Sequence, residues 1–186
     1  NGVLGMAQAM AFGDLAPVKP GVLEAYNRFM DAGLEALEAR RQRGHEYSWM
    51  NYGDWYGERS VNWGNLEYDL PWGLLLQFAR SGDYRYFDRA EQAARHIAGI
   101  DTVTVAPQPE RVGLMHLHCV GHTGGFNTPR VPDAVYWYDQ GWNDVGHTYA
   151  QGNFAASQVT GDPRYAESAR LVADWIATQT TRALSP

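Results

Sequence analysis

The sequence contains a single cysteine and a single lysine among its 186 residues. Cys119 has no second cysteine to pair with, so the fold cannot depend on an intrachain disulfide. Lys19 is the only lysine and lies between two prolines, which limits lysine chemistry to one position. No apolar run approaches the length of a membrane span. The chain also begins without a signal peptide or an initiator methionine, and we expect it to be a fragment of a longer protein.

The sequence also has little positive charge, which bears on its partners. The formal net charge is −6, and nucleic acid is therefore an unsuitable partner, because phosphate binding requires a basic face. By contrast, aromatic residues make up 13% of the chain and include seven tryptophans. Aromatic side chains build hydrophobic cores, but they also form the flat amphipathic surfaces on which sugars stack. Both uses remain open at this point.

Hydrophobic periodicity predicts a mostly helical chain. Apolar residues recur at steps of three and four, and capping residues precede or follow them. Gly-Asp turns separate the later helices, with Asp83 and Asp162 as N-caps. The predicted helices cover residues 20–43, 70–80, 83–98 and 147–159, and a further helix starts at Pro163.

The last two helix pairs are related to each other. A shift of 79 residues overlays positions 75–98 on 154–177, and eight of the 24 aligned positions are then identical. Chance would give about two, so the pattern indicates a repeated helical hairpin. The identical pairs include Gly82 with Gly161, Asp83 with Asp162, Arg85 with Arg164 and Tyr86 with Tyr165.

Long segments rich in glycine, aromatics and charge interrupt the helices. The stretch "GDWYGERSVNWGNLEY" at 53–68 has too many glycines for a helix and too many charges for a core strand. Residues 100–146 are likewise too broken for a long helix, and any strands there would be short. Long loops in a compact domain usually serve function, so these two segments are the places to look for a site.

Four segments in a fixed order carry a family resemblance. They are "NYGDWYGERSVNWGNLEYD" at 51–69, "LLLQFARSGDYRYFDRAEQAARH" at 74–96, "HLHCVGHTGG" at 116–125 and "GHTYAQG" at 146–152. Together they resemble the C-terminal (α/α) toroid of the exo-rhamnogalacturonan lyase-like family of polysaccharide lyases, over about residues 47–177. The hairpin turns by themselves resemble those of α/α-toroid glycoside hydrolases and polysaccharide lyases in general.

The resemblance implies an all-α-dominated fold, an incomplete (α/α) toroid of helical hairpins with long, partly β loops. It implies that residues 1–186 form one such domain, and that β-rich domains precede it in the full-length protein. The implied activity is β-elimination on a uronic-acid-containing polysaccharide such as pectin or rhamnogalacturonan. The implied partner is thus an acidic polysaccharide or oligosaccharide, with no nucleic acid and no membrane, and this substrate class favours an extracellular or periplasmic location.

A lyase of this kind needs a group that neutralises the uronate carboxylate, a base and an acid. Arg59 is the first candidate for the carboxylate, because a guanidinium matches a carboxylate in a bidentate manner. A salt bridge from Arg59 to a neighbouring acid is the structural alternative. Asn62 and Asn65 offer neutral donors to the same anion, or else local turn bonds. The neighbouring acids Asp54, Glu58 and Glu67 are counted with the substrate-binding candidates.

Four of the six histidines fall in two of the motif segments. His122 and His147 are candidate bases, and Tyr56 and Tyr149 are candidate acids, with the helix over 147–159 opening at the second histidine. His116 and His118 alternate, so on an extended segment both rings face one way and can contact substrate. With His122 they are also compatible with a divalent metal, although the spacing fits no standard zinc motif. Structural hydrogen bonding is the third alternative.

Trp55, Trp63 and Trp142 lie in glycine-rich segments and are candidate sugar-stacking surfaces, whereas Trp49, Trp72 and Trp175 are expected in the core. Two other functions compete with the lyase. A toroid-type glycoside hydrolase needs paired carboxylates, which Asp54, Glu58, Glu67 and Asp144 can supply. A non-catalytic carbohydrate-binding module needs only the aromatic surface.

Overall fold

The computed structural model describes residues 12–44, 68–115 and 148–184. These residues form five α-helices and no strand, which confirms the predicted all-α class. Two isolated β-bridges, Lys19 with Val22 and Thr102 with Met115, are the only β pairings among them. The helices are α2 (Glu24–Gly44), α3 (Leu70–Ser81), α4 (Tyr84–His96), α7 (Gln151–Thr160) and α8 (Pro163–Leu184), with a π-helical turn η1 (Ile97–Asp101) and a 3-10 turn η2 (Pro109–Arg111).

The two repeated hairpins turn in the same way. Gly82 ends α3 and Gly161 ends α7, with φ angles of 74° and 75°. This left-handed conformation is strained for residues with a Cβ atom, so both hairpins use glycine there. The next residue caps the following helix in each case. Asp83 accepts a hydrogen bond from the backbone N–H of Arg85 at 2.9 Å, and Asp162 accepts one from Arg164 at 3.0 Å. The repeat read from the sequence is therefore also a repeat of backbone geometry.

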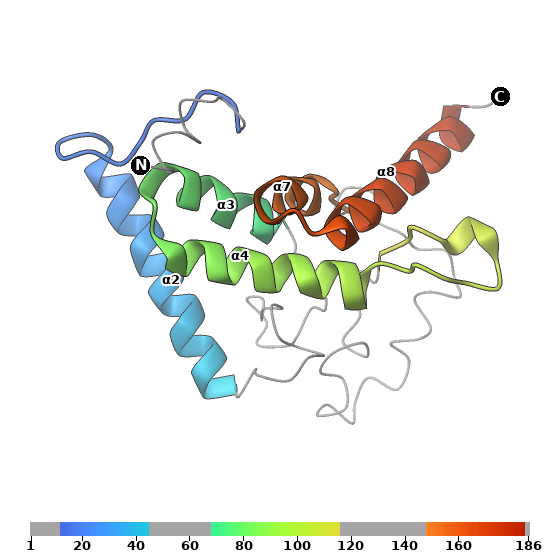
Figure 1. Ribbon diagram of the computed structural model, residues 1–186, viewed down its shortest axis with the longest axis horizontal. Helices are drawn as coiled ribbons and strands as arrows, with labels where there is room; N and C mark the ends of the chain where they lie inside the picture. The colour runs from blue at the N-terminus through green and yellow to red at the C-terminus, as the bar shows by residue number, and fades with distance from the viewer. Residues whose placement is uncertain (1–11, 45–67, 116–147, 185–186) are drawn as a thin grey trace.

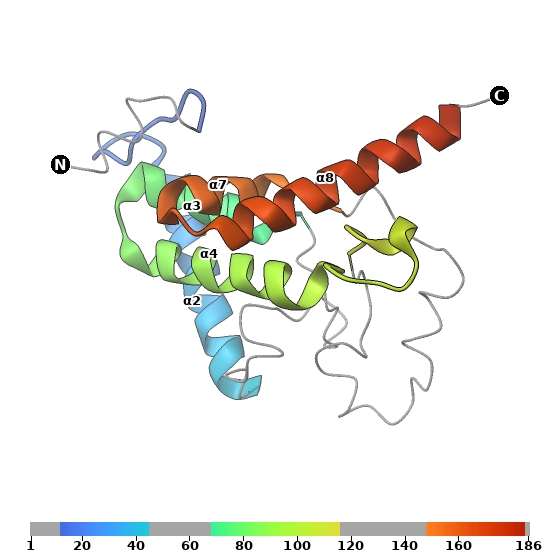
Figure 2. The same ribbon diagram turned by 45° about the vertical axis from the view of Figure 1, so that its right-hand side comes forward.

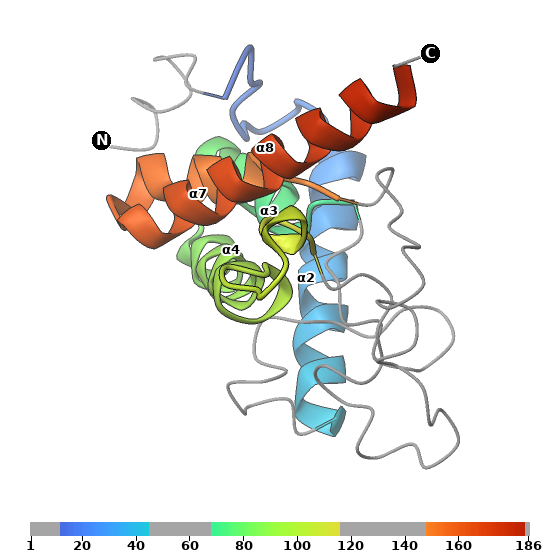
Figure 3. The same ribbon diagram turned by 90° about the vertical axis from the view of Figure 1, so that its right-hand side faces the viewer.

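The first helices of the two hairpins, α3 and α7, pack directly against each other (Figure 1). Their contact is the centre of the larger core cluster, in which Leu75 and Phe78 of α3 meet Ala155 and Ala156 of α7. The second helices, α4 and α8, cover this pair from the same side (Figure 3). Small residues in α7 permit the close approach of the two first helices.

The second helices are connected through tyrosine–carboxylate hydrogen bonds. The hydroxyl of Tyr86 on α4 donates to Asp31 on α2 at 2.8 Å, and the hydroxyl of Tyr165 on α8 donates to Glu91 on α4 at 2.5 Å. Each tyrosine is the third residue of its helix. Each acid is the eighth residue of its own helix, which is α2 for Asp31 and α4 for Glu91. Burial, and then the carboxylate partner, raises the pKa of Tyr165 to about 12, so its hydroxyl stays a donor. These bonds tie α2, α4 and α8 into one series (Figure 2).

Helix α2 begins four residues later than the predicted 20–43, and most of its apolar face lies open. Leu34 is buried in the main core cluster, whereas Tyr26 is 45% exposed and Phe29 is 73% exposed. The helix is attached largely through polar groups instead. Besides the Asp31 bond, Glu38 accepts hydrogen bonds from Arg89 of α4.

Two further helix boundaries differ from the sequence prediction. The helix predicted over 147–159 begins at Gln151, and the N–H of Gly152 in its first turn bonds to the carboxylate of Asp69. The helix predicted over 83–98 ends at His96 and gives way to η1, which runs to Asp101. Within the chain segments described by the structure, no helix combines the length and apolarity of a membrane span. Trp175 is buried and Trp72 packs against the core, as predicted for both.

Removing either tyrosine hydroxyl should destabilise the helix series. We expect Tyr86→Phe and Tyr165→Phe each to lower the free energy of unfolding by about 1.5 kcal/mol, because each loses a hydrogen bond to a charged group. The two losses should add in the double variant, since the pairs share no partner. Urea unfolding measures this. Tyr84→Phe is the matched control, because Tyr84 is 67% exposed, and a loss of equal size there would contradict the assignment.

Candidate functional site

The carboxylate of Asp69 lies between the first turns of α3 and α7. Its Oδ1 atom accepts from the backbone N–H of Trp72 at 3.4 Å, and its Oδ2 atom accepts from the N–H of Gly152 at 2.9 Å. The residue is 5% exposed and has a left-handed backbone, with φ of 55°. One side chain therefore caps two helices that are 83 residues apart in sequence.

Burial dominates the ionisation of this group. Loss of solvent raises the pKa of Asp69 from 3.8 to about 6, although the bonds from Gly152 and Trp72 lower it. Desolvation thus raises the pKa by more than the hydrogen bonds from the two backbone donors lower it. Asp69 is consequently a carboxyl group that changes its charge near neutral pH within the fold.

Gly152 makes this shared cap sterically feasible. A Cβ atom at Gly152 would lie 2.1 Å from Oδ1 of Asp69 and 2.7 Å from Cγ of Pro71. Ala150, which precedes the helix, provides no side-chain cap. One orphan N–H group at the start of α7, that of Gly152, is instead satisfied by Asp69, the residue that also caps α3.

A chain of buried polar groups continues from this point. Asn153, next to Gly152, donates from Nδ2 to the hydroxyl of Ser168 at 3.1 Å. The hydroxyl of Ser168 in turn lies 2.8 Å from that of Thr102, and either oxygen can be the donor. All three side chains are at most 5% exposed. They join α7, α8 and the segment that follows η1.

A histidine–aspartate pair lies at the end of α4, where that segment begins. Nε2 of His96 is 3.4 Å from Oδ1 of Asp101, and both side chains are fully buried. The two residues are five positions apart, which is the spacing that the π-helical turn brings together. Such turns are frequent at functional sites. An imidazole beside a carboxylate can hold or pass on a proton, or it can fix the turn in place.

The ends of the described segments meet next to these groups. Leu70, Met115 and Ala150 belong to one hydrophobic cluster, together with Ala93, Ile97 and Val172. Leu70 follows the sequence segment 45–67, while Met115 and Ala150 flank the segment 116–147. The C-terminal end of segment 45–67 and both ends of segment 116–147 therefore adjoin residues of one cluster, while segment 45–67 starts after Gly44 of α2.

Of the sequence-predicted site residues, Tyr149 lies within the described part of the chain. It is half-buried and precedes α7 rather than lying on it, so the expectation that it sits inside a helix is wrong. The other predicted residues lie outside the described ranges: Asp54, Trp55, Tyr56, Glu58, Arg59, Asn62, Trp63, Asn65, Glu67, His116, His118, His122, Trp142, Asp144 and His147. Within residues 12–44, 68–115 and 148–184, no group of three metal-ligating side chains gathers.

The sequence alone did not point to Asp69, His96, Asp101 or Asn153 as site residues. Residues near position 96 could have indicated that a helix ends there, but they do not indicate a π-helical turn. A cap shared across 83 residues leaves no signal in the local pattern of either helix.

Comparison of the chain with protein-family models, with curated proteins and with solved structures gave no match. The geometry above and the sequence itself therefore carry the functional argument.

The raised pKa of Asp69 predicts a characteristic pH dependence of stability. Because the folded pKa of about 6 exceeds the ordinary 3.8, its contribution is complete below about pH 4 and is lost as the pH rises through 6. The loss should approach about 3 kcal/mol in the free energy of unfolding. Asp69→Asn should remove this dependence, which urea unfolding between pH 4 and 7 measures.

Asp162→Asn serves as a control of opposite sign. The hydrogen bond from the side chain of Arg164 lowers the pKa of Asp162 to about 2, so that contribution is present above pH 4 and is lost as the pH falls toward 2. If wild type and Asp69→Asn change in parallel between pH 4 and 7, then the buried carboxylate does not titrate in this range.

A methyl group at Gly152 should separate the two helix starts. We expect Gly152→Ala to lower the free energy of unfolding by about 3 kcal/mol, because its Cβ would overlap Asp69 and Pro71. Gly33→Ala is the control, because a Cβ there meets open space in α2 and should add up to about 1 kcal/mol of stability through helix propensity. Thermal unfolding distinguishes the two signs, and a stabilised Gly152→Ala would contradict the close contact.

Proposed function

We propose that this chain is part of a polysaccharide lyase that cleaves a uronic-acid-containing polysaccharide by β-elimination. One observation carries the proposal: the C-terminal end of segment 45–67 and both ends of segment 116–147, the two segments richest in candidate chemistry, adjoin residues of a single cluster, Leu70, Met115 and Ala150. The resemblance of the motifs in these segments to the exo-rhamnogalacturonan lyase-like family supplies the reaction type.

The proposed reaction removes the proton from C5 of the uronate and breaks the bond from C4 to the glycosidic oxygen. A double bond forms between C4 and C5, and the leaving oxygen takes up a proton. In this proposal Arg59, helped by Asn62 and Asn65, neutralises the carboxylate and so stabilises the carbanion. His122 or His147 accepts the C5 proton, and Tyr56 or Tyr149 protonates the leaving oxygen.

The arrangement of the hairpins supports the finer part of the proposal, an incomplete (α/α) toroid. The first helices α3 and α7 pack closely, whereas α4 and α8 meet mainly through the hydrogen bond that the long side chain of Tyr165 donates to Glu91. Closer packing on one side than on the other curves a row of hairpins. The first turns of α3 and α7 also lie at one end, beside Asp69, which is where the proposal puts the substrate site.

The reaction products distinguish the proposed lyase from its rivals. Incubation with polygalacturonate and with rhamnogalacturonan should produce ultraviolet absorbance near the wavelength of a carboxyl-conjugated C4=C5 double bond. New reducing ends without that absorbance would instead favour a hydrolase that uses two of Asp54, Glu58, Glu67 and Asp144. Binding of the polymer without cleavage would favour the carbohydrate-binding module. The assay should use the full-length protein.

Arg59→Ala should lower kcat about 1000-fold while the protein remains folded, because the carbanion loses its counter-charge. Arg85→Ala is the matched control. Arg85 is 61% exposed and paired with Asp83 at the first hairpin turn, far from the proposed chemistry in sequence. If Arg59→Ala turns over as fast as Arg85→Ala, Arg59 has no part in the mechanism. The lyase assignment would then still be decided by the product assay.

A further inference from the structure

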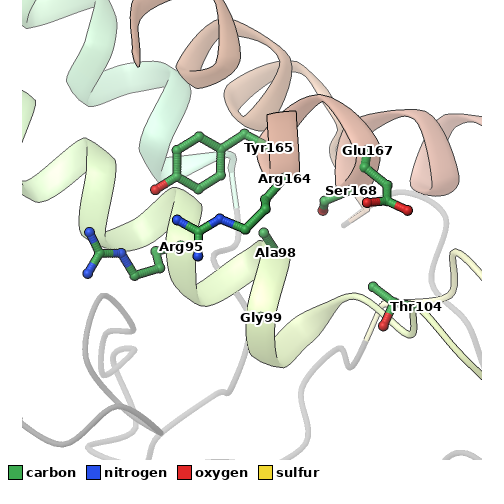
Figure 4. Close-up of a pocket in the computed structure, with 8 residues that line it drawn as sticks. All are labelled: Arg95, Ala98, Gly99, Thr104, Arg164, Tyr165, Glu167 and Ser168. Atoms are coloured by element: carbon green, nitrogen blue, oxygen red, sulfur yellow. The ribbon is translucent and has the colours of Figure 1, made fainter. Parts of the chain in front are cut away.

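A groove lies between α4 and α8, on the side of the hairpins where these helices are linked by the Tyr165–Glu91 bond. It has a volume of about 170 Å³ and runs along the last turn of α4, η1 and the first two turns of α8 (Figure 4). Ala98 and Gly99 line it from η1. The groove exists because α3 and α7 pack closely while α4 and α8 are held apart by a tyrosine.

The ends of the groove offer different hydrogen-bonding groups. Arg95 and Arg164 lie at one end, and Thr104 and Glu167 lie at the other (Figure 4). Arg164 uses its Nε and Nη2 atoms for Asp162, and among the described residues no acceptor pairs with its Nη1 group. The groove therefore presents a donor at one end and acceptors, together with a hydroxyl, at the other.

The inner wall of the groove is fixed rather than loose. Ser168 lines it and is 2% exposed. Its hydroxyl is held by Asn153 and Thr102, so this wall belongs to the buried polar chain described above. A rigid wall lowers the entropy that a ligand would lose by ordering its site.

The charge of the groove argues against an anionic ligand. Each arginine already has a carboxylate partner, since Arg95 pairs with Glu91 and Arg164 pairs with Asp162. Glu167 lines the groove as well, so that together with the partners Glu91 and Asp162 three carboxylates neighbour the two guanidinium groups. A neutral ligand avoids repulsion by this excess, and hydroxyl groups can satisfy both the donor and the acceptors.

The volume limits the ligand to one ring. A cavity of about 150 Å³ accommodates a benzene ring, so about 170 Å³ suits a single six-membered ring with little more. We propose that the groove between α4 and α8 binds one neutral pyranose ring, with its C–H face on Ala98 and Gly99 and its hydroxyls toward Arg164, Thr104 and Glu167. This inference goes beyond the proposed lyase activity and holds whether or not the chain catalyses β-elimination.

Nuclear magnetic resonance titration tests the groove directly. The ¹⁵N-labelled chain is titrated with the methyl glycosides of glucose, galactose and mannose, and in parallel with the methyl glycoside of glucuronate, in which a carboxylate replaces the C6 hydroxymethyl group of glucose. We expect saturable shifts at residues 95–104 and 164–168 for at least one neutral glycoside, with a dissociation constant on the order of 1 mM. Glucuronate should bind at least threefold more weakly.

Gly99→Val supplies the blocking variant. A side chain added at Gly99 starts in open space where η1 lines the groove, so it should fill the groove without displacing the helices. Affinity for the glycoside should fall at least tenfold. Gly33→Val is the matched control, since it also adds a branched side chain in open space of a helix and should leave the affinity unchanged. Glu167→Gln provides a second variant, at an exposed residue. It removes the carboxylate charge and should reduce the difference in affinity between the neutral glycoside and glucuronate.

Three outcomes would overturn the proposal. These are the absence of shifts with all three neutral glycosides, shifts that persist in a folded Gly99→Val variant, and tighter binding of glucuronate than of any neutral glycoside. The experiment measures binding without turnover. If the chain binds glycosides here but yields no unsaturated product, the glycoside site stands and the lyase assignment fails. If it yields unsaturated product but binds no glycoside here, the lyase assignment stands and the glycoside site fails.

Discussion

The Asp69 carboxylate shared by two helix starts is the constraint on which the rest of the fold depends. It fixes the first turn of α7 against the first turn of α3, and it requires glycine at position 152 because no Cβ fits there. Once these two helices are in register, their small and large side chains form the main core. The carboxylate has a raised pKa in this position, so the arrangement carries an electrostatic cost that the packing of the hairpins must offset.

The buried polar chain begins next to this junction, at Asn153. The buried pair of His96 and Asp101 and the polar chain through Ser168 lie on elements that meet at the start of α7. The cluster of Leu70, Met115 and Ala150 lies beside them. A site formed by the segments 45–67 and 116–147 would therefore lie next to these buried polar groups. Their role would be to hold the helix ends beside the site in one geometry.

Local chemistry explains which parts of this structure were predictable from the sequence. The helices and hairpin turns follow from apolar periodicity and from Gly82, Asp83, Gly161 and Asp162, all of which act within a few residues. The shared cap of Asp69, the pairing of His96 with Asp101 and the groove at Gly99 depend on contacts across the fold or on a π-helical turn. No window of sequence contains that information. The exposed Phe29 shows the same limit, because periodicity identifies an apolar face but not what covers it.

The tyrosine–carboxylate bonds have a consequence for cooperativity. The step from α2 to α4 and the step from α4 to α8 each join a tyrosine hydroxyl to a carboxylate at the same helix positions, with Asp31 in the first and Glu91 in the second. In such an array each unit is coupled chiefly to its nearest neighbours, so its stability behaves like that of a one-dimensional chain of linked units. Fraying should then start at a terminal unit and propagate inward, and the free energy of opening, as seen by amide hydrogen exchange, should be graded along the row.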